Sequence, residues 1–224
     1  MKPTLQDLFQ KLNTDFHKKL NWEFIYKLSN ESERGAVLIG TSKVEEILED
    51  LVVTILPNNS KKYKSKLLNY PGPISSFNGK IELLFAFRII DSKLYHALNS
   101  LRIVRNIAAH SSADFELKNF ENELIKIFDF EDFAVEVIPE WAKNSLIRFK
   151  TSQIKQIIEK QDIDEKTKEK IFEEQTKDLE NNSALQNQLR IWKLSYSLTI
   201  ICLKIKTIEN EYEKFDKNKT WIEI

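Results

Sequence analysis

Cysteine, glycine and proline are scarce in this sequence, and each shortage excludes a class of structure. Cys202 is the only cysteine among 224 residues, which excludes a disulfide framework within the chain and fits a reducing cytoplasm. There are 4 glycines and 5 prolines, so few residues interrupt helices. With abundant Lys, Glu, Leu and Ile, this composition favours helices over a β-sandwich. We therefore expect an all-α, cytoplasmic protein.

Sequence signatures of metal sites, phosphate-binding loops and membrane spans are missing as well. The histidines, His17, His96 and His110, are not accompanied by a Cys-x-x-Cys pair, and there is no Gly-rich phosphate loop. Uninterrupted apolar runs are short, as at residues 83–87, and lie far below the roughly 20 residues of a membrane span. The first residues have no apolar core of a signal peptide. We expect no metal, no cofactor and no membrane insertion.

An excess of charge of either sign is also absent, because 34 basic residues balance 34 acidic ones. A strongly basic chain would suggest general affinity for nucleic acid, whereas a balanced chain limits such a site to a local patch. The balance therefore counts against a free-standing DNA-binding repressor. No helix-turn-helix with a basic recognition helix is visible either.

Apolar residues recur at spacings of three and four along most of the chain, which is the pattern of amphipathic helices. Helices are expected over residues 4–29, 31–56, 75–90, 91–112, 139–160, 164–179 and 183–215. A loop is expected over 58–74, and a less regular segment over 115–138 that ends in a short extended piece at 135–138. We expect 1–138 to form a helical core on which 139–224 packs, as one continuous domain.

The helix over 91–112, called the central helix below, carries the most informative pattern. One of its faces is apolar and is expected to be buried: Leu94, Leu98, Leu101, Val104 and Ala108. Its second half carries Arg102, Asn106 and His110 at i, i+4 and i+8, so these side chains form one polar stripe, with Arg105 beside it. Solvated arginines and a histidine that caps helix carbonyls would explain the same residues without any function.

The sequence Arg105-Asn106-Ile107-Ala108-Ala109-His110 has the form Arg-Asn-x-x-x-His. It resembles the signature of the HEPN superfamily, many of whose members are metal-independent endoribonucleases. Two further segments, Ser32-Glu33-Arg34-Gly35 and Gly72-Pro73-Ile74-Ser75-Ser76-Phe77, give residues 31–115 a similarity to the mannitol operon repressor family, whose members are all-helical transcriptional regulators. These resemblances imply a HEPN-like antiparallel helical bundle with additional C-terminal helices. They also imply a homodimer in which two motifs share one cleft.

In such a ribonuclease, three residues would carry the chemistry. His110 would act as proton donor or acceptor, Arg105 would clamp a phosphate through two parallel hydrogen bonds, and Asn106 would orient the imidazole or donate to the phosphate. Arg102 would add a further RNA contact. The products would be a 2′,3′-cyclic phosphate and a 5′-hydroxyl.

Two glycines early in the helix over 31–56 suggest a close helix crossing. Gly35 and Gly40 each cost about 1 kcal/mol relative to alanine in a helix, which close packing would compensate. We expect the central helix to cross there, so that Arg34 binds RNA beside the polar stripe. Glu45 or Glu46 would face the same stripe, and Glu46 would then be an acid/base helper; the alternative is a solvated acidic face.

The expected loop over 58–74 follows Pro57 and carries Lys61, Lys62 and Lys64 around Tyr63. Such lysines can bind an RNA backbone while the tyrosine stacks on a base, although a charged run is also typical of a solvated loop.

The sequence thus leaves two classes of function open. The first is a HEPN-like endoribonuclease, such as a toxin or antiphage effector restrained by a partner protein. The second is a mannitol-repressor-like transcriptional regulator or protein-interaction module without catalysis, in which the polar residues hold a helix junction together.

Overall fold

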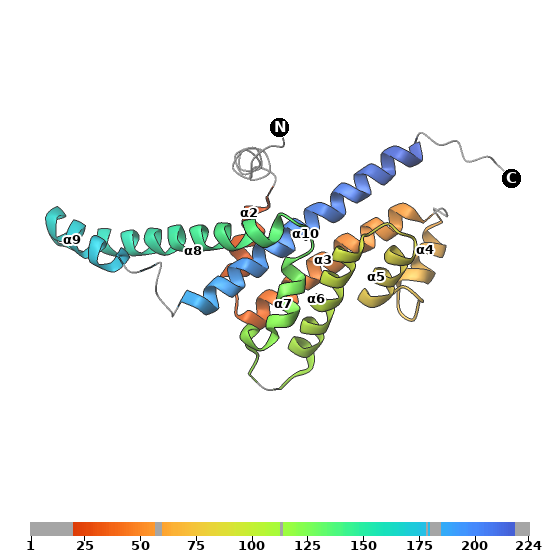
Figure 1. Ribbon diagram of the computed structural model, residues 1–224, viewed down its shortest axis with the longest axis horizontal. Helices are drawn as coiled ribbons and strands as arrows, with labels where there is room; N and C mark the ends of the chain where they lie inside the picture. Colours follow the sequence, from red (N-terminus) through yellow and green to blue (C-terminus); the bar gives the residue numbers. More distant parts are fainter. Residues whose placement is uncertain (1–19, 57–59, 113, 178, 180–184, 218–224) are drawn as a thin grey trace.

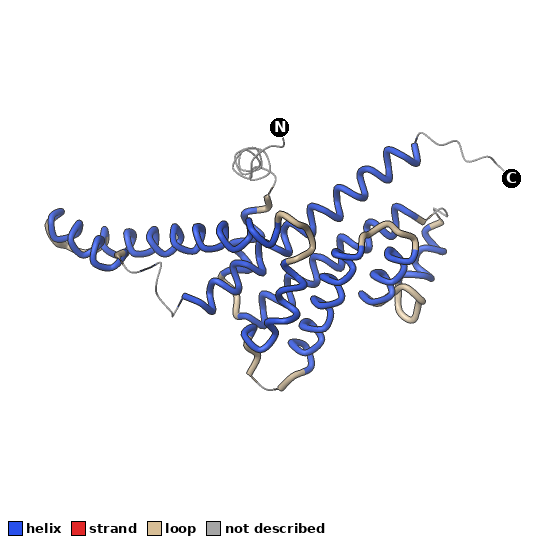
Figure 2. The backbone as a smooth tube through the Cα atoms, in the orientation of Figure 1, coloured by secondary structure: helices blue, strands red, loops and turns tan. Residues whose placement is uncertain are grey.

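The computed structural model describes residues 20–56, 60–112, 114–177, 179 and 185–217. These residues form an all-α bundle, as expected from composition, and no strand occurs among them (Figure 2). The helices are α2 (Trp22–Ser29), α3 (Glu33–Ile55), α4 (Lys61–Leu68), α5 (Phe77–Ala86), α6 (Ser92–His110), α7 (Glu121–Phe128), α8 (Ala134–Glu159), α9 (Glu165–Thr176) and α10 (Gln186–Lys217), with a 3-10 turn η1 (Leu117–Phe120). No helix in these ranges is long and apolar enough to cross a membrane. Residues 4–19 of the first expected helix lie outside the described ranges.

Helix α10 lies at the centre of the bundle. It runs along α3 and also contacts α2, α7 and α8 (Figure 1). Its interior positions are filled by large apolar side chains, among them Trp192, Tyr196, Leu198 and Ile201. The hydroxyls of buried Ser195 and Thr199 donate to backbone carbonyls four residues earlier, so these polar groups are satisfied inside the core. Both expected segments, 1–138 and 139–224, contribute residues to this one core.

Helix α10, and not the central helix, makes the close approach at Gly40. A Cβ on Gly40 would collide with the Cδ1 of Leu198, whereas the nearest atoms around a Cβ on Gly35 belong to Glu31 and Ser32 in its own helix start. The expectation that the central helix crosses at these glycines is therefore wrong. Apolar periodicity indicated a buried face but carried no information on which of several helices would cover it.

Helix α6 matches the central helix closely. Its N-cap is Asp91, whose carboxylate accepts a hydrogen bond from the Leu94 amide over 2.8 Å, and its last helical residue is His110. The apolar face of α6 is buried, and the helix packs against α3, α5 and α7.

Two local expectations are wrong. The expected loop over 58–74 contains helix α4, because lysine and leucine are good helix formers and Leu68 is buried against the core. Helix α8 starts at Ala134, so Pro139 lies inside it and there is no extended piece at 135–138. Burial of Val137 and Ile138 outweighs the one backbone hydrogen bond that the proline cannot donate.

Helices α8 and α9 form an arm that extends away from the rest of the bundle (Figure 1). Asp164 caps α9 as its sequence indicates, accepting from the Thr167 amide over 3.0 Å. No residue of α9 is buried, in agreement with its high charge.

Candidate functional site

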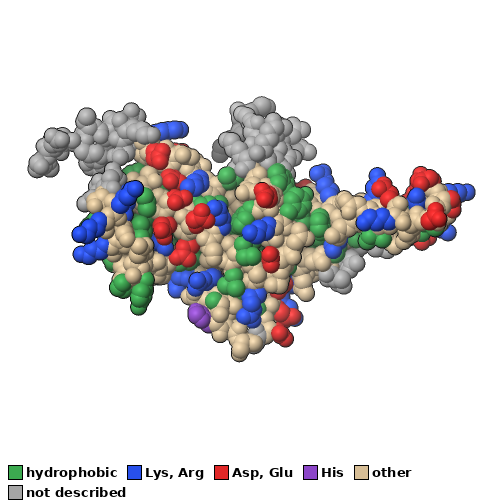
Figure 3. All heavy atoms as spheres, turned by 180° about the vertical axis from the view of Figure 1, so that it is seen from behind, with side chains coloured by type: hydrophobic (Ala, Val, Ile, Leu, Met, Phe, Trp, Pro, Cys, Tyr) green, Lys and Arg blue, Asp and Glu red, His purple; other side chains and the backbone are tan. Residues whose placement is uncertain are grey.

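The second half of α6 presents the polar stripe at the surface of the bundle. Arg102, Arg105 and Asn106 are half-buried and His110 is exposed, while Ile103 and Ile107 beside them are each 42% exposed. Seen from behind, the molecule shows a histidine side chain next to Lys and Arg side chains on a face that also carries acidic groups (Figure 3).

Neighbouring side chains along the stripe are joined by hydrogen bonds. The Arg105 guanidinium donates to the Asn106 amide oxygen over 3.2 Å, and the Arg102 Nε donates to the Asn99 amide oxygen over 3.3 Å. The first bond orients Arg105 and leaves the Asn106 amide nitrogen as a donor. The His110 side chain is exposed, and its imidazole makes no hydrogen bond to any described residue.

The start of α3 holds the end of α6 in place. The Arg34 guanidinium donates to the carbonyl oxygens of Ala108 (2.9 Å) and Ser111 (2.8 Å) and lies 5.8 Å from the Phe115 ring centroid. Helix ends leave their last carbonyls without partners inside the helix, and Arg34 satisfies that of Ala108 together with that of Ser111 just after the helix. Next to it, a Glu33 carboxylate oxygen accepts from the Leu117 amide.

Arg34 is thus brought to the polar stripe, as expected from the sequence, but its hydrogen bonds go to the protein backbone. Its role as the anchor of the α6 terminus was missed by sequence reasoning, and so was the part of Glu33. The only available signal was the succession of an N-cap serine and two charged residues at the start of α3, which specifies a helix start and no distant partner.

The lysines of α4 lie far from His110. Lys64 donates to the Val53 carbonyl oxygen over 3.2 Å at the end of α3, whereas Arg34 contacts α6 at the beginning of α3. Nineteen residues of helix separate these two contacts, about 28 Å. Lys61 and Lys62 are exposed on the same short helix. Any RNA contact there would be separate from the polar stripe.

Glu46 is not brought to the polar stripe in the described contacts. Its carboxylate pairs with Lys43 over 2.9 Å, is 62% exposed, and lies on the side of α3 near Cys202 of α10. The neighbouring Glu45 binds Lys80, whose side chain is only 3% exposed, over 3.1 Å. Both acidic residues therefore take part in ion pairs within the fold.

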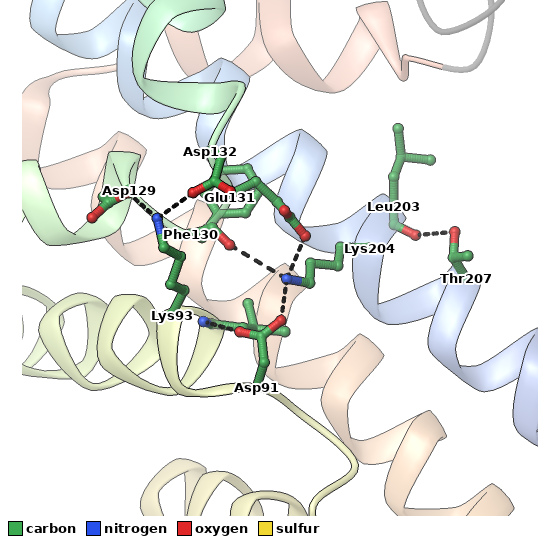
Figure 4. Close-up of polar contacts among 10 residues, drawn as sticks. Asp91, Lys93, Asp129, Phe130, Glu131, Asp132, Leu203, Lys204 and Thr207 are labelled. Atoms are coloured by element: carbon green, nitrogen blue, oxygen red, sulfur yellow. Dashed lines mark hydrogen bonds and ion pairs between the residues drawn. The ribbon is translucent and has the colours of Figure 1, made fainter. Parts of the chain in front are cut away.

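A second polar cluster lies at the opposite end of α6. The Lys204 ammonium of α10 pairs with Asp91 and Glu131, both at 2.6 Å, and donates to the Phe130 carbonyl oxygen (Figure 4). Burial acts to raise the pKa of Asp91, but hydrogen bonds from the Leu94 amide and Lys204 outweigh it, so the pKa lies below its usual value. This cluster ties α6, α10 and the α7–α8 turn together.

The chain matches no known protein family, no curated protein and no solved structure. Among the described residues, no group of three or more His, Cys, Asp and Glu side chains lies close enough to hold a metal ion. The candidate site is therefore defined by the residues of the polar stripe themselves.

Proposed function

We propose that this protein is a metal-independent endoribonuclease of the HEPN type, which acts in the cytoplasm as a homodimer. Two copies of the α6 terminus would meet in one cleft and cleave RNA there. The observation that carries the proposal is the exposed His110 imidazole, one turn after an Arg105–Asn106 pair joined by a 3.2 Å hydrogen bond. The helix end that presents it is anchored by Arg34.

RNA cleavage without a metal needs a base, an acid and a cation. The base removes the proton from the ribose 2′-hydroxyl, the 2′-oxygen attacks phosphorus, and the acid protonates the departing 5′-oxygen. Two copies of His110, one from each subunit, supply both proton-transfer groups. Arg105 stabilises the charge on the phosphorane-like transition state, because its planar guanidinium can donate two parallel hydrogen bonds. The products are a 2′,3′-cyclic phosphate and a 5′-hydroxyl.

A cleft of this kind would be toxic if it stayed open to cellular RNA. We therefore include in the proposal a toxin or antiphage role, with a partner protein that covers the α6 termini until cleavage is needed. Lys61, Lys62 and Lys64 would contact RNA outside the cleft.

The test is cleavage of total RNA in EDTA by the wild-type protein and two histidine variants. His110→Ala should abolish cleavage and the appearance of 2′,3′-cyclic ends. His96→Ala is the matched control, since His96 is also exposed on α6 but lies 14 residues earlier, about 21 Å along the helix. Equal cleavage by wild type and His110→Ala would remove the proposed mechanism.

The second candidate is a regulator or protein-interaction module with a mannitol-repressor-like fold. It is favoured by the hydrogen bonds of Arg34 to the Ala108 and Ser111 carbonyls, which account for this residue as part of a helix junction. In that case wild-type protein would leave total RNA intact, without cyclic phosphate ends, in the presence and absence of divalent metal ions.

A further inference from the structure

An aromatic pair lies on the same face of α6 as the polar stripe, near the beginning of the helix. Phe85 of α5 stacks on Tyr95 of α6 with ring centroids 4.0 Å apart and planes inclined by 20°. Phe85 is 37% exposed, so part of its ring is open to solvent although the ring has a stacking partner. The Tyr95 hydroxyl donates to the Glu82 carboxylate over 3.1 Å, and this bond fixes the orientation of the ring.

Hydrogen bonds connect this pair to the polar stripe. The Asn99 amide donates to the Tyr95 carbonyl oxygen over 3.3 Å and accepts from Arg102, one turn closer to Arg105. Tyr95, Asn99, Arg102 and Asn106 follow each other at spacings of three and four, so they lie on one face of the helix. From Tyr95 to His110 this face extends over 15 residues, about 22 Å.

We propose that a single-stranded RNA substrate lies along this face of α6, with one base stacked on the Phe85–Tyr95 pair and its phosphates against Arg102 and Arg105. This inference rests on the proposed ribonuclease function and adds its substrate class. Aromatic side chains bind single strands because every unpaired base offers a flat face, whereas the bases of a duplex already stack on each other. The 22 Å face accommodates about six nucleotides at a stacked rise of 3.4 Å each.

The charges along this face of α6 indicate which end contacts the base and which end contacts the phosphates of the RNA. Arg102 and Arg105 lie near His110, where the scissile phosphate must be. At the aromatic end, the Glu82 carboxylate repels phosphate but can accept a hydrogen bond from a base amino group. On α6 itself, the aromatic end therefore binds a base, and Arg102 and Arg105 bind the backbone.

There is room for a nucleotide beside the aromatic pair. Phe85 also lines a hollow of about 720 Å³ between the α5–α6 turn and α10, together with Arg88, Ile89 and Ser92. The Arg88 guanidinium is exposed and makes no hydrogen bond or ion pair with the described residues. It can bind the phosphate that follows the stacked base. Asp91 and Lys204 border the same hollow, where they neutralise each other in a 2.6 Å ion pair.

The test measures binding of a fluorescent 2′-O-methyl RNA octanucleotide, which cannot be cleaved through its 2′-oxygen, to the full-length protein. Phe85→Ala and Phe85→Leu should each weaken binding about tenfold, the range expected for loss of one stacked base. Phe85→Leu keeps most of the apolar volume. If its thermal unfolding midpoint equals that of wild type, weaker binding results from lost stacking and not from misfolding. Phe87→Ala is the matched control, because Phe87 is 67% exposed on the neighbouring turn and forms none of the ring pairs found among the described residues. This variant should bind the RNA with an affinity within twofold of wild type.

Two results would overturn the inference. Unchanged binding by both Phe85 variants would remove the aromatic pair from the RNA site, and equal binding of a 20-base-pair duplex by wild type would remove the preference for single strands. Neither result changes the expected outcome of the cleavage test on His110→Ala. Conversely, if His110→Ala cleaves like wild type while Phe85 variants bind poorly, the chain binds single strands without the proposed chemistry.

Discussion

The Arg34 guanidinium donates a hydrogen bond to the Ala108 carbonyl oxygen over 2.9 Å, across 74 residues of sequence. A second bond, to Ser111 over 2.8 Å, makes this one side chain the cap of the α6 terminus. Since Ala108 and Ser111 flank His110, the same contact sets the position of the proposed catalytic imidazole.

Replacement of Arg34 should therefore destabilise the fold. Arg34→Gln loses hydrogen bonds from a charged donor to two half-buried carbonyls, and we expect a loss of about 1 to 3 kcal/mol in the free energy of unfolding, measured with urea. Arg148→Gln is the control, because Arg148 is exposed on α8 and has no hydrogen bond to the described residues; it should change stability by less than about 0.5 kcal/mol. Equal effects of the two substitutions would contradict the capping role.

The two glycines of α3 should respond oppositely to alanine. Gly40→Ala places a methyl group against Leu198, which is fully buried, and should cost about 1 to 3 kcal/mol through overpacking. Gly35→Ala meets the movable Glu31 carboxylate at 2.9 Å and gains helix propensity, so its stability should be equal to wild type or higher by up to about 1 kcal/mol. Adding Leu198→Ala to Gly40→Ala should cost less than the sum of the two single effects. If the losses in the free energy of unfolding are additive, the side chain of Leu198 is not the group that the absence of a Cβ at Gly40 accommodates.

Asp91 should make the stability of the fold depend on pH in the acid range. Its pKa is lowered in the folded state, so its contribution is fully present above the unfolded pKa of about 3.9 and is lost as the pH falls through the folded value. Asparagine keeps the N-cap but not the Lys204 ion pair. Urea unfolding at pH 7 and pH 3 should therefore give a smaller difference for Asp91→Asn than for wild type. Asp162→Asn, at an exposed position between α8 and α9, should retain the wild-type difference.

The features of this fold that sequence reasoning predicted depend on close neighbours along the chain. The expected helices over 91–112 and 164–179 begin at Asp91 and Asp164, and in the structure each of these side chains caps its helix by accepting from a backbone amide three residues later. The polar stripe of α6 follows from helix periodicity alone. Its exposed His110 and half-buried Arg105 are in the positions that the spacing indicates.

The errors concern effects that periodicity does not encode. The segment at α4 was expected to be a loop because its lysines were interpreted as a charged run, although burial of Leu68 favours a helix. The start of α8 was placed at Pro139, since a proline commonly begins a helix, but the buried residues before it extend the helix to Ala134. Periodicity likewise did not indicate that Phe85, on the expected helix over 75–90, is 37% exposed and stacks on Tyr95 at the surface.

The sequence by itself determined that this protein is helical, where most helices lie and which residues of α6 share a face, because these properties follow from propensity and spacing within a few residues. Only the tertiary structure decided that α10 covers Gly40, that Lys204 joins Asp91 and Glu131, and that Arg34 caps α6. Each of those contacts brings together residues far apart in the chain, and their pairing depends on how whole helices fill a common core.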